Sequence, residues 1–77
     1  MRFKAFILTN VNLGCEHEIL EALRNVEGFD GAFYVLGDYD IIASISADSI
    51  DGLNNTVTQV RKFRNVRSTA TMIVREL

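Results

Sequence analysis

A turn signal near the middle of the chain separates two runs of β-forming residues. Gly37 and Asp38 stand between the run that begins at Phe33 and the run that extends to Ser46. Glycine at the first central position fits a type II′ turn, whose twist suits a two-residue hairpin loop. The sequence therefore predicts a β-hairpin here, with a second carboxylate at Asp40. Asp and Gly also favour ordinary solvated turns, so the turn pair alone does not establish a site.

Hydrophobic spacing predicts the remaining elements. Residues 3–9 predict a strand, and residues 15–26 carry apolar side chains at helical spacing and end before Gly28. Residues 48–51 combine a candidate N-cap with an acidic first turn and predict the start of a second helix. Residues 66–75 are rich in Val, Thr and Ile and predict a last strand. The buried stripe of the second helix is expected to be Ile50, Leu53, Val57 and Val60.

The predicted order is βαββαβ, which divides the chain into two βαβ halves, residues 1–36 and 37–77. Right-handed crossovers then give a four-stranded antiparallel sheet with both helices on one face, the ferredoxin-like arrangement of an α+β protein. A fold of this kind names no function by itself.

The length of 77 residues predicts one domain, residues 1–77. A single cysteine and a single histidine allow no internal disulfide and no tetrahedral zinc site, so stability must come from burial or self-association. The sequence contains no apolar run of membrane-spanning length, and its start, Met1–Lys4, does not resemble a signal peptide. A cytoplasmic protein with no membrane partner is therefore expected.

The charge of the chain argues against nucleic acid as a direct partner. Its formal net charge is −2 at pH 7, whereas nucleic-acid binding depends on clustered Lys and Arg that neutralise phosphates. The one basic cluster is interpreted as the solvated end of the second helix, where cations complement the helix dipole. This cluster consists of Arg61, Lys62, Arg64 and Arg67.

Strand alternation predicts that one face of the sheet is covered by the helices and the other is apolar and open. An open apolar face usually marks an interface, so a dimer formed face to face through the sheets is expected. The side chains expected to face the helices are Phe3, Ala5, Ile7, Ile41, Ala43, Ile45, Ala70, Met72 and Val74. Those expected on the open face are Lys4, Phe6, Leu8, Ile42, Ser44, Thr69, Thr71 and Ile73.

Polar groups from three segments are expected at one end of this sheet. The loop of residues 10–14 leads into the first helix, whose free N–H groups favour an anion. The hairpin contributes Asp38 and Asp40, and the last strand contributes the hydroxyls of Thr69 and Thr71. Carboxylates for an ammonium and hydroxyl or N–H donors for a carboxylate suit a small zwitterion. A free amino acid is the simplest such ligand.

Three sequence features occur together in one known family. They are the Gly-Asp-Tyr-Asp run of residues 37–40 followed by an apolar strand, Gly14 before the first helix, and Thr69 and Thr71 in the final strand. In this combination the chain resembles the effector-binding domain of the Lrp/AsnC, or feast/famine, transcription regulators. The resemblance covers nearly the whole chain.

The resemblance implies a ferredoxin-like fold, dimers that assemble into tetramers or octamers, and amino-acid effectors bound between dimers. Regulators of this family usually carry an N-terminal helix-turn-helix domain, whereas this chain begins at its first strand. A stand-alone sensor module is therefore expected, which acts alone or modifies a DNA-binding relative by mixed assembly. No cofactor and no metal are expected. The positions that match the ligand-binding residues of the family are Gly37, Asp38, Tyr39, Asp40, Thr69, Ala70 and Thr71.

Enzyme and scaffold functions remain as alternatives. Cys15 and His17 are two apart on a helix, so their side chains diverge and cannot pair as nucleophile and base. A small dimeric αβ-barrel monooxygenase shares the predicted fold, but it needs a catalytic polar group in the sheet cleft, for which only Ser44 or Thr71 is available. A purely structural oligomerisation module is the other alternative. No enzyme activity is expected.

Overall fold

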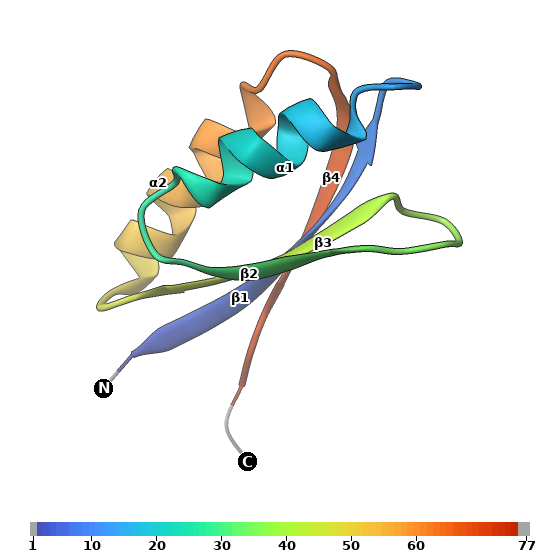
Figure 1. Ribbon diagram of the computed structural model, residues 1–77. Helices are drawn as coiled ribbons and strands as arrows, with labels where there is room; N and C mark the ends of the chain where they lie inside the picture. The colour runs from blue at the N-terminus through green and yellow to red at the C-terminus, as the bar shows by residue number, and fades with distance from the viewer. Residues whose placement is uncertain (1, 76–77) are drawn as a thin grey trace.

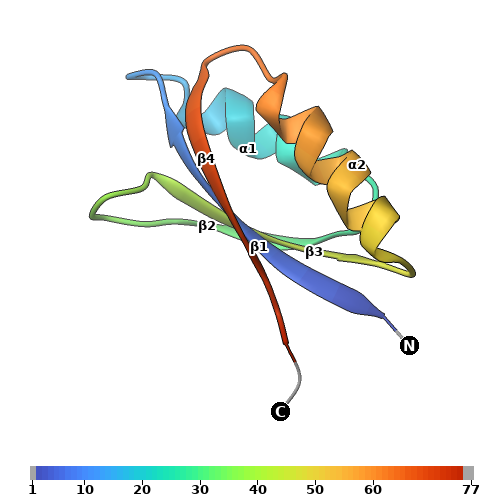
Figure 2. The same ribbon diagram turned by 180° about the vertical axis from the view of Figure 1, so that it is seen from behind.

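The computed structural model describes residues 2–75 of the chain. Four strands form one antiparallel sheet in the order β2-β3-β1-β4. Both helices pack on the same face of this sheet, and the other face is left uncovered (Figure 1, Figure 2). This arrangement confirms the predicted ferredoxin-like fold. The elements are β1 (Phe3–Val11), α1 (Glu16–Arg24), β2 (Phe29–Tyr34), β3 (Ile41–Ala47), α2 (Ile50–Arg61) and β4 (Val66–Ile73).

The start of α2 follows the predicted capping pattern. The hydroxyl oxygen of Ser49 accepts a hydrogen bond from the N–H of Gly52 (3.0 Å), which satisfies one of the free donors of the first turn. The predicted buried stripe is wrong at its first position, because Ile50 is 40% exposed. Thr56 is buried instead, and its hydroxyl donates to the carbonyl of Glu27 (3.1 Å). That hydrogen bond removes the usual cost of burying a hydroxyl.

The core lies between the sheet and the two helices. Alternate residues of β1 are buried against the helices, from Ala5 through Ile7 and Thr9 to Val11. Thr9 is fully buried, and its hydroxyl donates to the carbonyl of Ile41 (3.3 Å) on the neighbouring strand. No helix within residues 2–75 is long and apolar enough to cross a membrane. The remaining buried hydrophobic residues are Ile19, Leu23, Val26, Ile41, Ala43, Ile45, Leu53, Val57 and Val60.

The predicted faces of β4 are reversed in the structure. Asn10 lies opposite Ser68 and Val11 lies opposite Val66, so Arg67 is an extra residue that forms a β-bulge on β4. One extra residue exchanges the two faces of a strand beyond that point.

The cross-strand pairs show which β4 residues lie on each face, because opposite residues project to the same side of a sheet. Thr69, Thr71 and Ile73 lie opposite Thr9, Ile7 and Ala5, which face the helices. Ala70 and Met72 lie opposite Leu8 and Phe6, on the open face. The expectations for Thr69, Thr71, Ile73, Ala70 and Met72 were therefore wrong. The faces predicted for β1 and β3 are confirmed.

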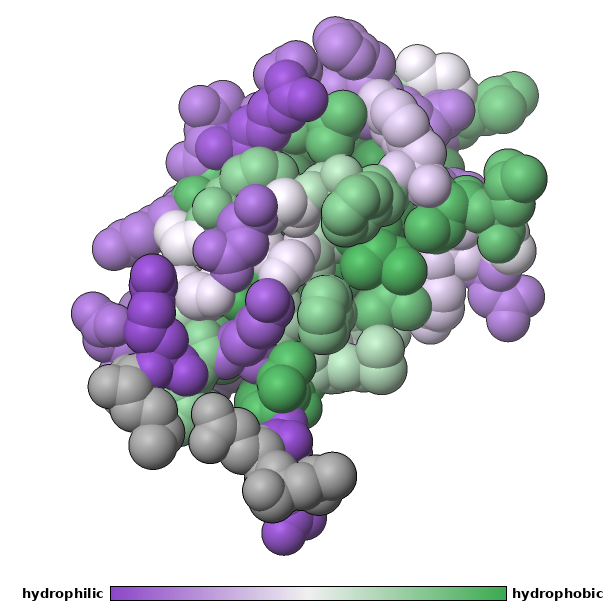
Figure 3. Space-filling view, turned by 60° about the horizontal axis from the view of Figure 1, so that its bottom comes forward, coloured by the Kyte–Doolittle hydropathy of each residue, from purple (hydrophilic) through white to green (hydrophobic). Residues whose placement is uncertain are grey.

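The open face remains apolar after this correction. Two cross-strand rows run over it, Phe33–Ile42–Leu8–Ala70 and Gly31–Ser44–Phe6–Met72. Phe33 is 68% exposed and Met72 is 55% exposed. Figure 3 brings this side of the molecule forward and shows a continuous hydrophobic area across it.

The loop of residues 35–40 differs from the predicted two-residue turn. A hydrogen bond from the N–H of Val35 to the carbonyl of Asp40 (2.9 Å) closes it, so four residues form the bend. Leu36 lies in this loop, beyond the end of β2 at Tyr34, and is fully exposed. Gly37 has a φ of 137°, which favours glycine over residues that carry a Cβ atom. The hairpin was predicted correctly, but its turn type was wrong.

We expect the protein to form at least a dimer through its open face, because an apolar surface of this extent is rarely left in water. Phe6→Asp or Leu8→Asp should weaken the assembly by about 3 kcal/mol or more, since each would bury an unpaired charge. Static light scattering on wild type and variants measures the mass of the assembly. Ile50→Asp, at a partly exposed apolar position in the helical layer, is the matched control. A wild-type mass of one 8.7 kDa chain at micromolar concentration would contradict the expectation.

Gly28→Ala should destabilise the fold strongly. Gly28 has a φ of 82°, and an added Cβ would lie 2.0 Å from the carbonyl oxygen of Ser46. The left-handed backbone alone costs a non-glycine residue about 1–2 kcal/mol, and relief of the clash adds to this cost. Urea denaturation should show the loss. Gly14→Ala is the control, because Gly14 has a similar φ of 84° but a Cβ there meets nothing within 4 Å, and equal stability losses in both variants would contradict an effect of the clash.

Candidate functional site

Asp40 joins the β2–β3 loop to the end of β1. Its backbone N–H donates to the carbonyl of Thr9 (2.9 Å), which extends the pairing between β3 and β1. Its carboxylate oxygen Oδ2 accepts a hydrogen bond from the N–H of Val11 (2.9 Å). One carboxylate oxygen therefore holds the loop against β1.

The start of β4 is tied to the same end of β1 through Asn65. The backbone N–H of Asn12 donates to the carbonyl of Asn65 (2.8 Å), and the two side chains are also hydrogen-bonded (3.1 Å). The side-chain amide of Asn65 donates in turn to Glu18 of α1 (2.9 Å). These contacts confirm the prediction that the first loop, the hairpin loop and the start of the last strand lie at one end of the sheet.

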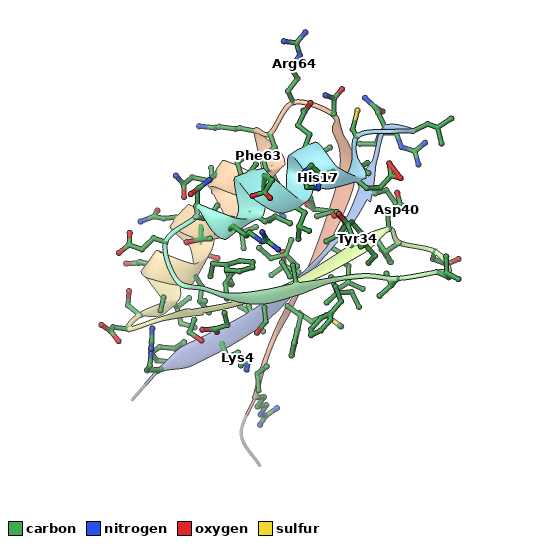
Figure 4. All side chains as sticks on the ribbon, viewed as in Figure 1. Lys4, His17, Tyr34, Asp40, Phe63 and Arg64 are labelled. Atoms are coloured by element: carbon green, nitrogen blue, oxygen red, sulfur yellow. The ribbon has the colours of Figure 1, made fainter. Side chains whose placement is uncertain are left out.

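A hollow of about 300 Å³ lies where these elements meet. Its lining combines two carboxylates, one guanidinium and two apolar side chains, from Glu16, Asp40, Arg67, Val11 and Leu13. Figure 4 shows Asp40 near the start of α1, at the side of the molecule where the β2–β3 loop projects. Charges of both signs beside an apolar wall suit a small molecule that carries both an ammonium and a carboxylate.

A smaller hollow of about 180 Å³ borders the start of β4. Two guanidinium groups and two hydroxyl groups line it, from Arg61, Arg67, Ser68 and Thr69, together with Val66. The ion pairs found within residues 2–75 all lie on α1, so neither arginine has an ion-pair partner in this part of the chain. Arg67 lines both hollows.

The predicted hairpin residues lie partly in solvent. Gly37 and Asp38 are exposed at the tip of the loop, and Tyr39 is half-buried. Only Asp40 reaches the hollow beside α1. The two carboxylates predicted together therefore have different surroundings, and Asp38 forms no hydrogen bond to another side chain within residues 2–75.

The predicted β4 residues are divided between three environments. Thr69 lines the smaller hollow, and Ala70 lies on the open face. Thr71 lies on the helix side, where its hydroxyl oxygen is buried without a hydrogen-bond partner within residues 2–75. A single chain thus brings Asp40 and Thr69 to one end of the sheet but leaves Asp38 and Thr71 apart from them.

Sequence reasoning missed Glu16 and Arg67 as lining residues. The sequence did not single out Glu16, and it placed Arg67 in the solvated basic cluster. In the structure α2 ends at Arg61, and Arg67 lies on the β4 bulge. The position of Glu16 could have indicated its role. Glu16 lies at the start of the first helix, just after the loop of residues 10–14, and that helix start was already a candidate for ligand binding.

A hollow of about 580 Å³, larger than these two, lies at the other end of the sheet, beside Gly28 and the start of α2. Several of its polar side chains are already hydrogen-bonded within the fold. Ser49 accepts from Gly52, Thr56 donates to Glu27, and Ser46 donates to Asp30. None of the residues predicted from the sequence to bind a ligand lines this hollow, whereas Asp40 lines the hollow at the opposite end of the sheet.

The comparison with known proteins identifies the family. A family profile described as the Lrp/AsnC ligand binding domain matches residues 4–76. The chain therefore belongs to the Lrp/AsnC family, as the ligand-binding domain of transcription regulators. The resemblance seen in the sequence is confirmed.

Individual relatives agree with this assignment. The HTH-type transcriptional regulator FL11 of Pyrococcus furiosus is 33% identical over 70 residues, which cover 91% of this chain and 46% of FL11. The solved structure of FFRP-DM1 has a TM-score of 0.89 and 33% identity, and the match covers 94% of this chain and 97% of FFRP-DM1. The chain spans less than half the length of the curated relatives that it matches.

One more distant structure shares the fold. A transcriptional regulator of Neisseria meningitidis in complex with L-Met has a TM-score of 0.85 and 13% identity, and the match covers 96% of this chain and 50% of that protein. At this identity the likeness shows the fold alone.

These relatives are transcriptional regulators, which points away from an enzyme. The geometry offers little to catalysis. His17 has an 81% exposed side chain that contacts Glu21 (3.8 Å), and Cys15 precedes it at the start of α1. Ser44 and Thr71, the candidates for a monooxygenase, lie on opposite faces of the sheet. Within residues 2–75 no group of three or more His, Cys, Asp or Glu side chains is arranged to hold a metal ion.

Asp40→Ala should destabilise the protein by about 1–3 kcal/mol, because it leaves the N–H of Val11 without its acceptor. Asp40→Asn keeps an acceptor oxygen and should lose less. Asp38→Ala, at an exposed position, is the control and should leave the free energy of unfolding near that of wild type. Urea denaturation measures all three, and an Asp40→Ala variant as stable as wild type would show that the carboxylate does not support the fold.

Proposed function

We propose that this domain binds a free amino acid at the end of the sheet where Asp40 and Thr69 lie. The observation that carries the proposal is the hollow beside Asp40, which combines carboxylates, a guanidinium and an apolar wall at the junction of α1, β1, β3 and β4. An amino acid needs acceptors for its ammonium and donors for its carboxylate, and charge-assisted hydrogen bonds of both kinds are strong. The family profile that matches the chain describes a ligand binding domain, which supports the binding of a small effector.

The proposed binding residues are Gly37, Asp38, Tyr39, Asp40, Thr69, Ala70 and Thr71. A single chain leaves some of them apart, because Asp38 projects from an exposed loop and Ala70 lies on the open face. A second subunit can bring such groups to one ligand. We therefore place the site at a contact between subunits of a homo-oligomer.

The proposed role of binding is regulation of transcription. The domain is the ligand-binding part of regulators, and curated relatives are named as helix-turn-helix regulators. Ligand binding at a subunit contact changes the relative stability of assembly states, since a ligand favours the state that binds it better. We propose that residues 1–77 act as one sensing domain whose assembly modulates a DNA-binding partner of the same family.

A thermal-shift screen against the standard L-amino acids tests the proposal, because a ligand that binds the native state raises the melting temperature. At least one amino acid should raise it, with confirmation by calorimetry. Asp38→Ala and Asp40→Asn should each weaken binding by about tenfold to a hundredfold, since each removes a charged partner. Asp51→Ala, on the first turn of α2, is the control.

Absence of binding by any amino acid to wild type would overturn the proposed function and favour a structural oligomerisation module. Binding that is undiminished in both Asp38→Ala and Asp40→Asn would place the amino acid elsewhere on the domain.

A further inference from the structure

Arg67 occupies an unusual position at the candidate site. It is the extra residue of the β4 bulge, opposite the Asn10–Val11 step of β1. Its side chain is exposed and lines both the hollow that contains Asp40 and the hollow that contains Thr69. A bulge often re-aims a side chain next to a binding site. Arg67 is thus the cation placed between a carboxylate-lined and a hydroxyl-lined surface.

Glu16 lies on the other wall of the larger hollow, in the first turn of α1. Its oxygen Oε1 is buried and has no hydrogen-bond partner within residues 2–75. A buried acceptor of this kind is costly unless something satisfies it. Glu16 and Arg67 are not paired with each other, because the ion pairs of the described residues are those of Glu21 with His17 and Arg24.

We propose that Glu16 and Arg67 are the two charged anchors of the amino-acid site, with Arg67 binding the α-carboxylate and Glu16 binding the α-ammonium. This inference rests on the proposed function and adds two residues to its site. The planar guanidinium of arginine presents parallel N–H groups that match a carboxylate. An ammonium in the hollow can be bound by the Glu16 carboxylate, which lines it and accepts no hydrogen bond within residues 2–75.

The hydrogen bonds already formed explain why Glu16 is a better ammonium partner than Asp40 alone. Asp40 Oδ2 accepts from the N–H of Val11, so part of its acceptor capacity is used by the fold. Neighbouring Glu18 accepts from Asn65 and is likewise engaged. Glu16 has an acceptor left for a ligand.

The apolar wall of the hollow, formed by Val11 and Leu13, is where the side chain of the ligand would lie. Val11 is buried, whereas Leu13 is fully exposed on the loop before α1. An exposed leucine at the rim can fold over an apolar ligand side chain and gain burial that it lacks in the free protein. With its two ends held by Arg67 and Glu16, an amino acid would direct its side chain towards this wall.

Calorimetry on charge-neutral variants tests the assignment. The probe is the L-amino acid that gives the largest shift in the thermal screen. Arg67→Gln and Glu16→Gln should each weaken its binding by about tenfold to a hundredfold, because each removes one charge-assisted partner. Arg64→Gln and Glu21→Gln are matched controls at exposed positions outside both hollows and should leave the affinity unchanged.

Ligand analogues separate direct contact from a structural effect. The α-carboxamide of the probe lacks the carboxylate, so Arg67→Gln should not weaken its binding further, whereas Glu16→Gln should. The analogue without the α-amino group should show the reverse pattern. Losses that are the same for the probe and both analogues would overturn the assignment and give the two residues a structural role.

Two further outcomes are distinguishable. Binding of the probe that is unchanged in both Arg67→Gln and Glu16→Gln would overturn this inference and leave the proposed function standing. Absence of amino-acid binding to wild type would overturn both. If Arg67→Gln does not fold, Arg67→Lys takes its place as the test variant. It keeps the charge but loses the planar pair of donors, so it should bind the probe with an affinity below that of wild type.

Discussion

The step between Asn10 and Val11 at the end of β1 fixes the two neighbouring strands at once. On one side, the N–H of Val11 is bonded to the carboxylate of Asp40, which holds the β2–β3 loop. On the other side, the register shifts so that Arg67 becomes an extra residue on β4. β1 lies between β3 and β4 in the sheet, so this step affects both neighbours. It fixes the position of the β2–β3 loop and the face that each β4 side chain takes. It also sets the position of Arg67 on the bulge.

The two surfaces of the molecule follow from that step. With β4 shifted, Ala70 and Met72 extend the apolar open face, and Thr69 is placed at the end of the sheet beside Arg67. The open face suits association with another subunit, and the polar end suits a small charged ligand. A domain with both surfaces can couple ligand binding to assembly, which is the physical requirement for a sensor that regulates through its oligomeric state.

The charged groups at the end of the sheet serve different purposes. One carboxylate oxygen of Asp40 accepts a hydrogen bond from the N–H of Val11. Removal of the Asp40 carboxylate is therefore expected to lower the stability of the fold as well as the affinity for the ligand. Glu16 and Arg67 have no such internal partners among the described residues, and their charges are free for a ligand. Replacement of Asp40 by Ala therefore changes stability and binding together, whereas Asp40→Asn keeps an acceptor for Val11, and changes at Glu16 and Arg67 remove no hydrogen bond of the described fold.

The sequence alone determined the order of elements, the faces of β1 and β3 and a capped helix start within residues 48–51, because these depend on local periodicity and on contacts within a few residues. The Gly-Asp-Tyr-Asp run, Gly14 and the two threonines together indicated the family that the profile match confirms. Only the tertiary structure decided the four-residue bend, the reversed faces of β4 and the meeting of Glu16 and Arg67 at one hollow. A bulge depends on how two distant strands align, and no alternation pattern within β4 itself records that alignment.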